Sequence, residues 1–173
     1  MKRFTLVLVA VAALAGVVVS MIPASGQSGK EAAPFVTQIP LGYRDWKLVS
    51  VAHEAGNINS IGAVLGNDVA IKAYREKTLP FPDGSIIAAL HYSYVPSEEN
   101  NKIFGRDQSF VPGSPTNIQF LVKDSKKYAA TGGWGFGHFN KDGTHGNAAF
   151  MKPCFPCHAQ AKDSDLVFTH YAP

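Results

Sequence analysis

The chain has 173 residues, 46% of them hydrophobic and 17% charged, which is enough apolar material for one domain with its own core. Its 16 Lys and Arg residues against 13 Asp and Glu residues give a formal net charge of +3, which does not indicate nucleic acid or a strongly acidic partner. Only two cysteines are present, and both belong to one short motif near the C-terminus, so we expect no disulfide.

The first 26 residues are predicted to be a secretory signal peptide. Lys2-Arg3 precedes an apolar run from Phe4 to Val19, and Ala24-Ser25-Gly26 supplies the small residues of a cleavage site. We therefore expect a periplasmic protein; because the apolar run is slightly long for a signal, an N-terminal membrane anchor is the alternative. Residues 27–40 are expected to be a flexible lead-in to a folded domain over residues 41–173.

The first half of this domain is predicted to contain two strands and a helix. Residues 47–53 are rich in β-branched side chains and indicate a strand, whereas residues 57–66 are expected to form an irregular connection. Asn67 can cap a helix that ends at residues 77–80. Residues 85–95 are apolar on both faces, which indicates a central strand. The apolar stripe of the helix is predicted to consist of Val69, Ala73 and Tyr74.

The second half is predicted to begin with a long polar loop over residues 96–115. Residues 117–122 then alternate as a strand, and Asp124 can cap a short helix that runs through Ala130. Residues 133–139 alternate glycine with large rings, which predicts a strand whose bare face meets another backbone or a flat ligand; a haem plane and tight sheet packing are the two alternatives. A last strand is expected over residues 166–171. The fold class is therefore α+β, a mostly antiparallel β-sheet with a few short helices.

The motif that contains both cysteines is Cys154-Phe155-Pro156-Cys157-His158. Cys-x-x-Cys-His is the attachment site of a c-type haem: the two thiols bond covalently to the porphyrin, and the histidine binds the iron. One haem c per chain, attached near the C-terminus, is therefore predicted. A thioredoxin-like disulfide would require a strand-to-helix setting in a βαβ unit, and a zinc site would require a second pair of cysteines.

The residue on the opposite side of the iron is not a methionine. Met21 is removed with the signal peptide, and Met151 lies only seven residues before His158, on the same side of the haem. An open iron or a second histidine remains. His91, on the predicted central strand, is the first candidate for a distal ligand, and His138 is the second. An open iron would bind small diatomic or nitrogenous ligands.

Several stretches, in the same order along the chain, resemble the cytochrome P-460 family, which includes the β-sheet cytochromes c′-beta. The resemblance implies an antiparallel sheet, a homodimer and a five-coordinate haem with His158 as its proximal ligand. The stretches are Tyr43-Arg44-Asp45-Trp46, Phe81-Pro82-Asp83-Gly84, residues 122–126, Trp134-x-Phe136, the haem motif and residues 161–169.

Two positions depart from the hydroxylamine-oxidising members of that family. The lysine that is cross-linked to the porphyrin in those members corresponds here to Ala89, and the distal carboxylate of some members corresponds to Gln119. Because an amide cannot accept a proton as a carboxylate does, the resemblance favours a haem protein that binds or converts nitric oxide or similar species. The alternatives are a hydroxylamine oxidoreductase with a soluble redox partner and a bis-histidine electron carrier.

Overall fold

The structure, a computed structural model, describes residues 35–172 apart from the side chain of Phe150. The predicted signal peptide, residues 1–26, and most of the predicted lead-in lie outside the described residues. Within residues 35–172, no helix is both long and apolar enough to cross a membrane.

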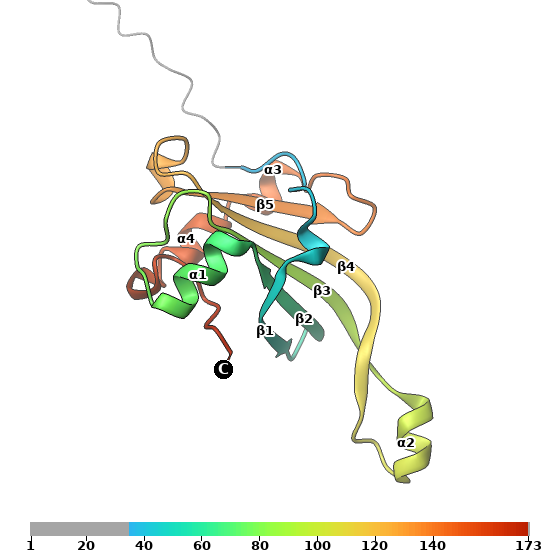
Figure 1. Cartoon of the computed structure of the whole chain (residues 1–173). Helices are drawn as coiled ribbons and strands as arrows, with labels where there is room; N and C mark the ends of the chain where they lie inside the picture. The colour runs from blue at the N-terminus through green and yellow to red at the C-terminus, as the bar shows by residue number, and fades with distance from the viewer. Residues whose placement is uncertain (1–34, 173) are drawn as a thin grey trace, which may run out of the picture. The chain divides into compact units, whose positions relative to one another are not determined.

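Five antiparallel strands form one sheet, in which neighbours along the chain are also neighbours in the sheet (Figure 1). The class predicted from the sequence, α+β with a mostly antiparallel sheet, is confirmed. The predicted central strand is β3, which pairs with β2 on one side and with β4 on the other. The strands are β1 (Lys47–Glu54), β2 (Ser60–Gly66), β3 (Ile86–Pro96), β4 (Phe110–Lys123) and β5 (Trp134–Asn140).

Apolar side chains form a core on each face of this sheet. On one face, α1 and the C-terminal part of the chain pack on Val64, Ile87 and Phe136. On the other face, Phe120 and Phe139 pack with the segment that precedes β1. The helices are α1 (Asp68–Glu76), α2 (Glu98–Phe104), α3 (Ala148–Met151) and α4 (Cys154–His158), with 3-10 helices η1 (Tyr43–Asp45), η2 (Ala129–Thr131) and η3 (Lys162–Ser164).

The predicted helix after Asn67 is α1, and its cap is confirmed. The Asn67 side chain accepts a hydrogen bond from the backbone N–H of Ala70, and Lys77 ends the helix in a left-handed conformation. The predicted apolar stripe is only partly right. The buried residues are Ala70, Ile71 and Ala73, and Tyr74 is half-buried, whereas Val69 is exposed.

The prediction of an irregular connection over residues 57–66 is wrong, because residues 60–66 form β2. Glycine and alanine have low strand propensity, and they concealed this strand in the sequence. Tertiary packing requires these small residues: a Cβ on Gly66 would lie 3.2 Å from the side chain of Val49 and 3.4 Å from that of Ile71. Close packing against β1 and α1 therefore overrides local propensity.

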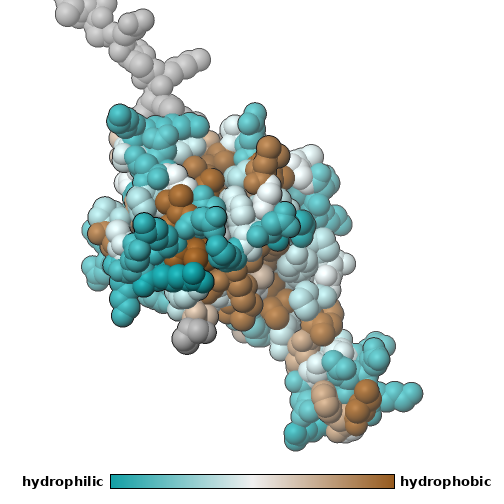
Figure 2. All heavy atoms as spheres, in the orientation of Figure 1, coloured by the Kyte–Doolittle hydropathy of each residue, from teal (hydrophilic) through white to brown (hydrophobic). Residues whose placement is uncertain are grey.

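The predicted polar loop over residues 96–115 is also wrong. β3 and β4 continue as a hairpin with α2 at its far end, away from α1 and α4 (Figure 1). Pro112, Gly113 and Pro115 concealed the strand, and they are accommodated by irregular pairing next to Tyr92. On α2, Ile103 and Phe104 are exposed, and Figure 2 shows hydrophobic side chains among hydrophilic ones at this end.

Two further predictions need adjustment, and a third agrees with the structure. Asp124 does accept hydrogen bonds from the N–H groups of Lys126 and Lys127, but a turn and η2 follow instead of a continuous helix. Residues 166–171 form no strand, because Leu166 has a φ of 66° and only isolated hydrogen bonds tie this tail down. The strand predicted over residues 133–139 is β5, and Gly135 serves the tight packing that was one of the two explanations for its glycines: a Cβ there would overlap the ring of Tyr128.

Candidate functional site

A cavity of about 260 Å³ lies between one face of the sheet and the C-terminal part of the chain. Residues of all five strands line its sheet side. Paired residues of neighbouring antiparallel strands lie on the same face of a sheet, and this pairing brings residues of different strands to one cavity. The lining residues are Ala52, Glu54, Gly62, Val64, Ile87, Ala89, His91, Gln119, Phe120, Leu121, Phe136, Gly137 and His138 from the sheet, with Cys154, His158, Val167, Phe168 and Thr169 opposite.

The Cys-x-x-Cys-His motif is the short helix α4. Cys154 and His158 line the cavity, whereas Cys157 is exposed, and the two thiols are not joined to each other. Phe155 packs toward Phe136 of β5, with ring centroids 6.3 Å apart. Burial raises the pKa of the Cys154 thiol. One turn of helix thus places a thiol and the histidine beside the same cavity.

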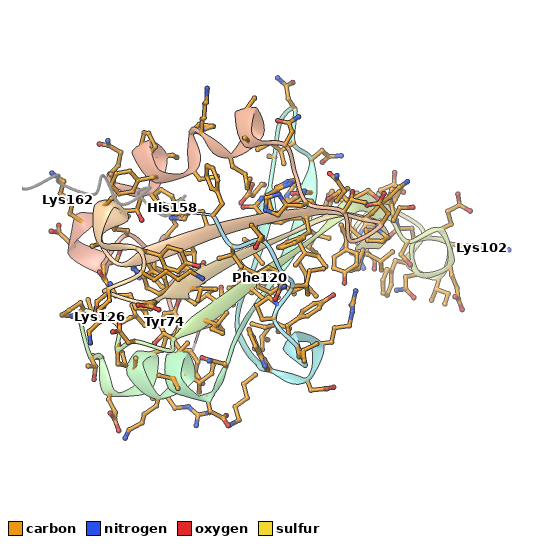
Figure 3. The ribbon with its side chains drawn as sticks, turned by 90° about the horizontal axis from the view of Figure 1, so that it is seen from above. Tyr74, Lys102, Phe120, Lys126, His158 and Lys162 are labelled. Carbon is orange, nitrogen blue, oxygen red and sulfur yellow. The ribbon has the colours of Figure 1, made fainter. Side chains whose placement is uncertain are left out.

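His158, labelled in Figure 3, is held in one tautomer by a hydrogen bond to the backbone. Its Nδ1 lies 2.7 Å from the carbonyl oxygen of Leu166, and because a carbonyl can only accept, Nδ1 carries the hydrogen and donates it. Nε2 therefore keeps its lone pair. Burial lowers the pKa of His158, and the bond to Leu166 partly opposes this shift. A neutral imidazole with a free Nε2 is the form that binds a metal ion.

Two aromatic rings pack against this imidazole. The ring centroid of Phe136 lies 5.1 Å from that of His158, and the ring centroid of Phe168 lies 4.8 Å from it. Phe136 belongs to β5, and Phe168 belongs to the tail that follows η3. Both the sheet and the tail therefore contact His158.

The sequence-predicted distal residues lie together on the sheet side of the cavity. Ala89 pairs with Gln119, and Gln119 pairs with His138, so these three form one row across β3, β4 and β5. His91 lies two residues beyond Ala89 and pairs with Gly62. Residues that the sequence placed on three separate strands thus line one cavity with Cys154 and His158.

Comparison with known protein families decides the classification. The family described as cytochrome P460 matches residues 40–169, which is most of the chain. The chain belongs to the cytochrome P460 family. A search of curated proteins finds no match. The family resemblance read from the sequence is confirmed, whereas the homodimer, the redox partner and the periplasmic location stay predictions.

Membership of the cytochrome P460 family implies a haem cofactor, and the donor set fits one. Two thiols and a neutral imidazole lie within five consecutive residues, next to a cavity lined mainly by apolar and aromatic side chains. Within the described part of the chain, no three His, Cys, Asp or Glu side chains could hold a metal ion by themselves. A zinc site therefore lacks a ligand set there.

Two further histidines on the sheet side are shifted toward their neutral form. Burial is the main cause of the lowered pKa of His91, and the charge of Glu54 partly opposes it. Burial also lowers the pKa of His138, and the positive charges that His91 and His145 can carry add to the effect. Both imidazoles can therefore bind a metal or accept a hydrogen bond near neutral pH.

Glu54 is the site residue that the sequence did not reveal. It lies at the end of β1, is exposed to solvent and lines the cavity near His91. In the family pattern the carboxylate position is occupied by Gln119, so a carboxylate was not expected. Two residues before Glu54, Ala52 pairs with Gly62 of β2, which pairs with His91 of β3. Recognition of β2 in the sequence would have been needed to find Glu54.

Proposed function

We propose that this P460-family protein is a periplasmic haem c protein with an open distal position, which binds or converts small nitrogen species such as nitric oxide. Cys154 and Cys157 would hold one haem covalently, and His158 would be its proximal ligand. The observation that supports this most directly is the fixed tautomer of His158, whose Nδ1–H is bound to Leu166 and whose Nε2 is free to bind iron.

The pocket supplies no thioether for the distal position. Met151 is buried in the protein and is absent from the residues that line the cavity. A bound ferrous haem supplies a coordination position for a diatomic or nitrogenous ligand. The chain itself orients the proximal imidazole between Phe136 and Phe168 and leaves a small side chain, Ala89, on the sheet side.

Ligand binding is tested by absorption spectroscopy of the reduced protein. We expect a haem, measured by the pyridine haemochrome assay, and a ferrous spectrum that changes on addition of carbon monoxide or nitric oxide. A low-spin ferrous spectrum that neither gas alters would contradict the open site. Removal of the proximal ligand in His158→Ala is expected to change the spectrum while covalent haem is retained.

Bis-histidine ligation is the second candidate, because His91 lines the same cavity as His158. Replacing His91 by Ala would then convert the iron to high spin. The matched control is His53→Ala, since His53 is exposed, stacks on Tyr94 with centroids 3.8 Å apart, and does not line the cavity. An unchanged spectrum in His91→Ala excludes His91 as a ligand.

Hydroxylamine oxidation is the third candidate, and Glu54 is the observation that favours it. A carboxylate beside a neutral imidazole can accept protons from a bound substrate, which Gln119 cannot. Ala89 leaves the cross-link position without an amine. Reduction of a dye by hydroxylamine that is lost in Glu54→Gln would support this reaction; no dye reduction by the haem-loaded protein would exclude it.

A further inference from the structure

A buried ion pair lies behind the tail that holds His158. The ammonium of Lys123, on β4, lies 2.9 and 2.8 Å from the two carboxylate oxygens of Asp165. Its side chain is 6% exposed and that of Asp165 is 14% exposed. Lys123 also donates to the carbonyl of Gly132 at 3.1 Å and lies 4.9 Å from the centre of the Trp134 ring. All donors of this lysine are therefore used.

Asp165 is the point at which separate segments hold the tail. Its carboxylate accepts a hydrogen bond from the N–H of Phe81 at 2.8 Å, in addition to those from Lys123. Its backbone carbonyl accepts a hydrogen bond from the indole Nε1 of Trp134 at 2.7 Å. The loop before β3, β4 and β5 thus all bind the same residue.

The backbone next to Asp165 is strained in a way that serves His158. Asp165 has a φ of 51° and Leu166 a φ of 66°, so two consecutive residues with side chains are left-handed, a conformation that costs free energy. This turn presents the Leu166 carbonyl to Nδ1 of His158 at 2.7 Å. Such a turn persists only when its surroundings hold it.

We propose that Lys123 and Asp165 are positioning residues for the proximal ligand. Through the turn at residues 165–166 they fix the Leu166 carbonyl, and that carbonyl orients His158 and makes its imidazole a stronger donor. A buried ion pair adds little net stability compared with apolar residues of the same size, so stability alone does not account for it. This inference rests on the proposed role of His158 as the proximal ligand.

The test compares three variants with the haem-loaded wild-type protein. Lys123→Met and Asp165→Asn each leave one partner unpaired. The double variant Lys123→Met/Asp165→Asn removes both charges, replaces the lysine by an apolar side chain and keeps an acceptor for the N–H of Phe81 at a residue type that tolerates a positive φ, so it is the variant designed to keep the fold. The control is Lys47→Met/Asp68→Asn, which removes an ion pair of 2.6 Å whose side chains are 57% and 87% exposed.

The measurement is the iron–imidazole stretching band of the ferrous protein by resonance Raman spectroscopy, with haem content from the haemochrome assay and amide exchange at residues 165–168. We expect the band to move to lower frequency and the amides to exchange faster in the double variant, with haem content unchanged. The control should match the wild-type protein. The midpoint potential should become more positive in the double variant, because a weaker donor stabilises ferric iron less.

Two results would overturn the inference. If the double variant is folded and keeps the wild-type band, potential and exchange, the pair has no positioning role. If the wild-type protein carries haem but shows no iron–imidazole band, and the band stays absent in His91→Ala, which lacks the candidate second histidine, His158 is not the proximal ligand, and the proposed function fails with the inference. The first result refutes the positioning role alone and leaves the proposed function standing.

Discussion

Asn67 joins the start of α1 to the start of β3. Its Oδ1 accepts hydrogen bonds from the N–H groups of Ala70 and Ile86, both at 3.0 Å, and its Nδ2 donates to the carbonyl of Gly84 at 2.8 Å. The sequence predicted the cap, but it could not predict the bonds to residues 84 and 86. Those bonds exist only because β3 begins next to the helix N-terminus.

Replacing Asn67 by Ala is expected to lower the free energy of unfolding by about 1–3 kcal/mol, because two backbone N–H groups lose their acceptor. Urea denaturation followed by circular dichroism measures this change. Asn67→Asp keeps both acceptor bonds but replaces the donor to Gly84 by a carboxylate oxygen, so its loss reports on the bond that Nδ2 donates. Unchanged stability in Asn67→Ala would show that the acceptor oxygen is unimportant.

Gly135 shows the same dependence on tertiary structure. Its missing side chain makes room for the ring of Tyr128, which is 3% exposed. Gly135→Ala is expected to lower stability by about 1–3 kcal/mol, because the added methyl group overlaps that ring. Gly62→Ala is the control, since its Cβ would lie 3.5 Å from Nδ1 of His91, an ordinary contact. Equal melting temperatures for the two variants would contradict this explanation.

Among the elements, those with strong local signals were predicted and those that depend on packing were not. α1, β3 and β5 carry a cap, a continuous apolar run and alternating rings, and each was found near its observed position. β2 is built from small residues, and the outer part of β4 contains prolines. Their hydrogen bonds to neighbouring strands decide their structure, and a single sequence does not contain that information.

α4 is the element that we expect to depend most on the proposed haem. It has five residues, none of them fully buried, and no side chain caps its N-terminus, so it is marginal by itself. In Cys154→Ser/Cys157→Ser, which cannot attach haem, the amides of residues 154–158 should exchange at least about tenfold faster than in the haem-loaded protein. Mass spectrometry after hydrogen exchange measures this, with β3 as the internal reference. Equal protection of α4 in both forms would show that it folds without haem.

At the scale of the whole molecule, the motif was predictable and its surroundings were only partly so. The Cys-x-x-Cys-His motif predicted one side of the cavity, and the family pattern predicted Ala89 and Gln119 on the side opposite that motif. Glu54 and the carbonyl of Leu166 could not be predicted. Glu54 comes to the cavity only through the pairing of three strands, and the carbonyl depends on a left-handed turn that no residue type marks.

The lowered pKa values of His91 and His138 predict that acid destabilises the fold. Below a pH of about 6.5 the unfolded chain takes up protons at these histidines that the folded chain does not. Stability should therefore be full above that pH and should fall as the pH is lowered through it. Urea denaturation at pH 7.5 and 5.5 measures the loss, which His138→Gln should reduce. A variant with the same loss as the wild-type protein would exclude His138 as a contributor.

The last strand of the sheet is covered along its outer side. Val36 donates its N–H to the carbonyl of Phe136 at 2.7 Å, and Gly146 donates to the carbonyl of His138 at 2.8 Å. An uncovered outer strand recruits strands from other molecules and starts fibril growth. Proteolytic trimming beyond residue 36 would uncover Phe136, so a protein shortened in this way would be expected to polymerise while its haem pocket stays whole.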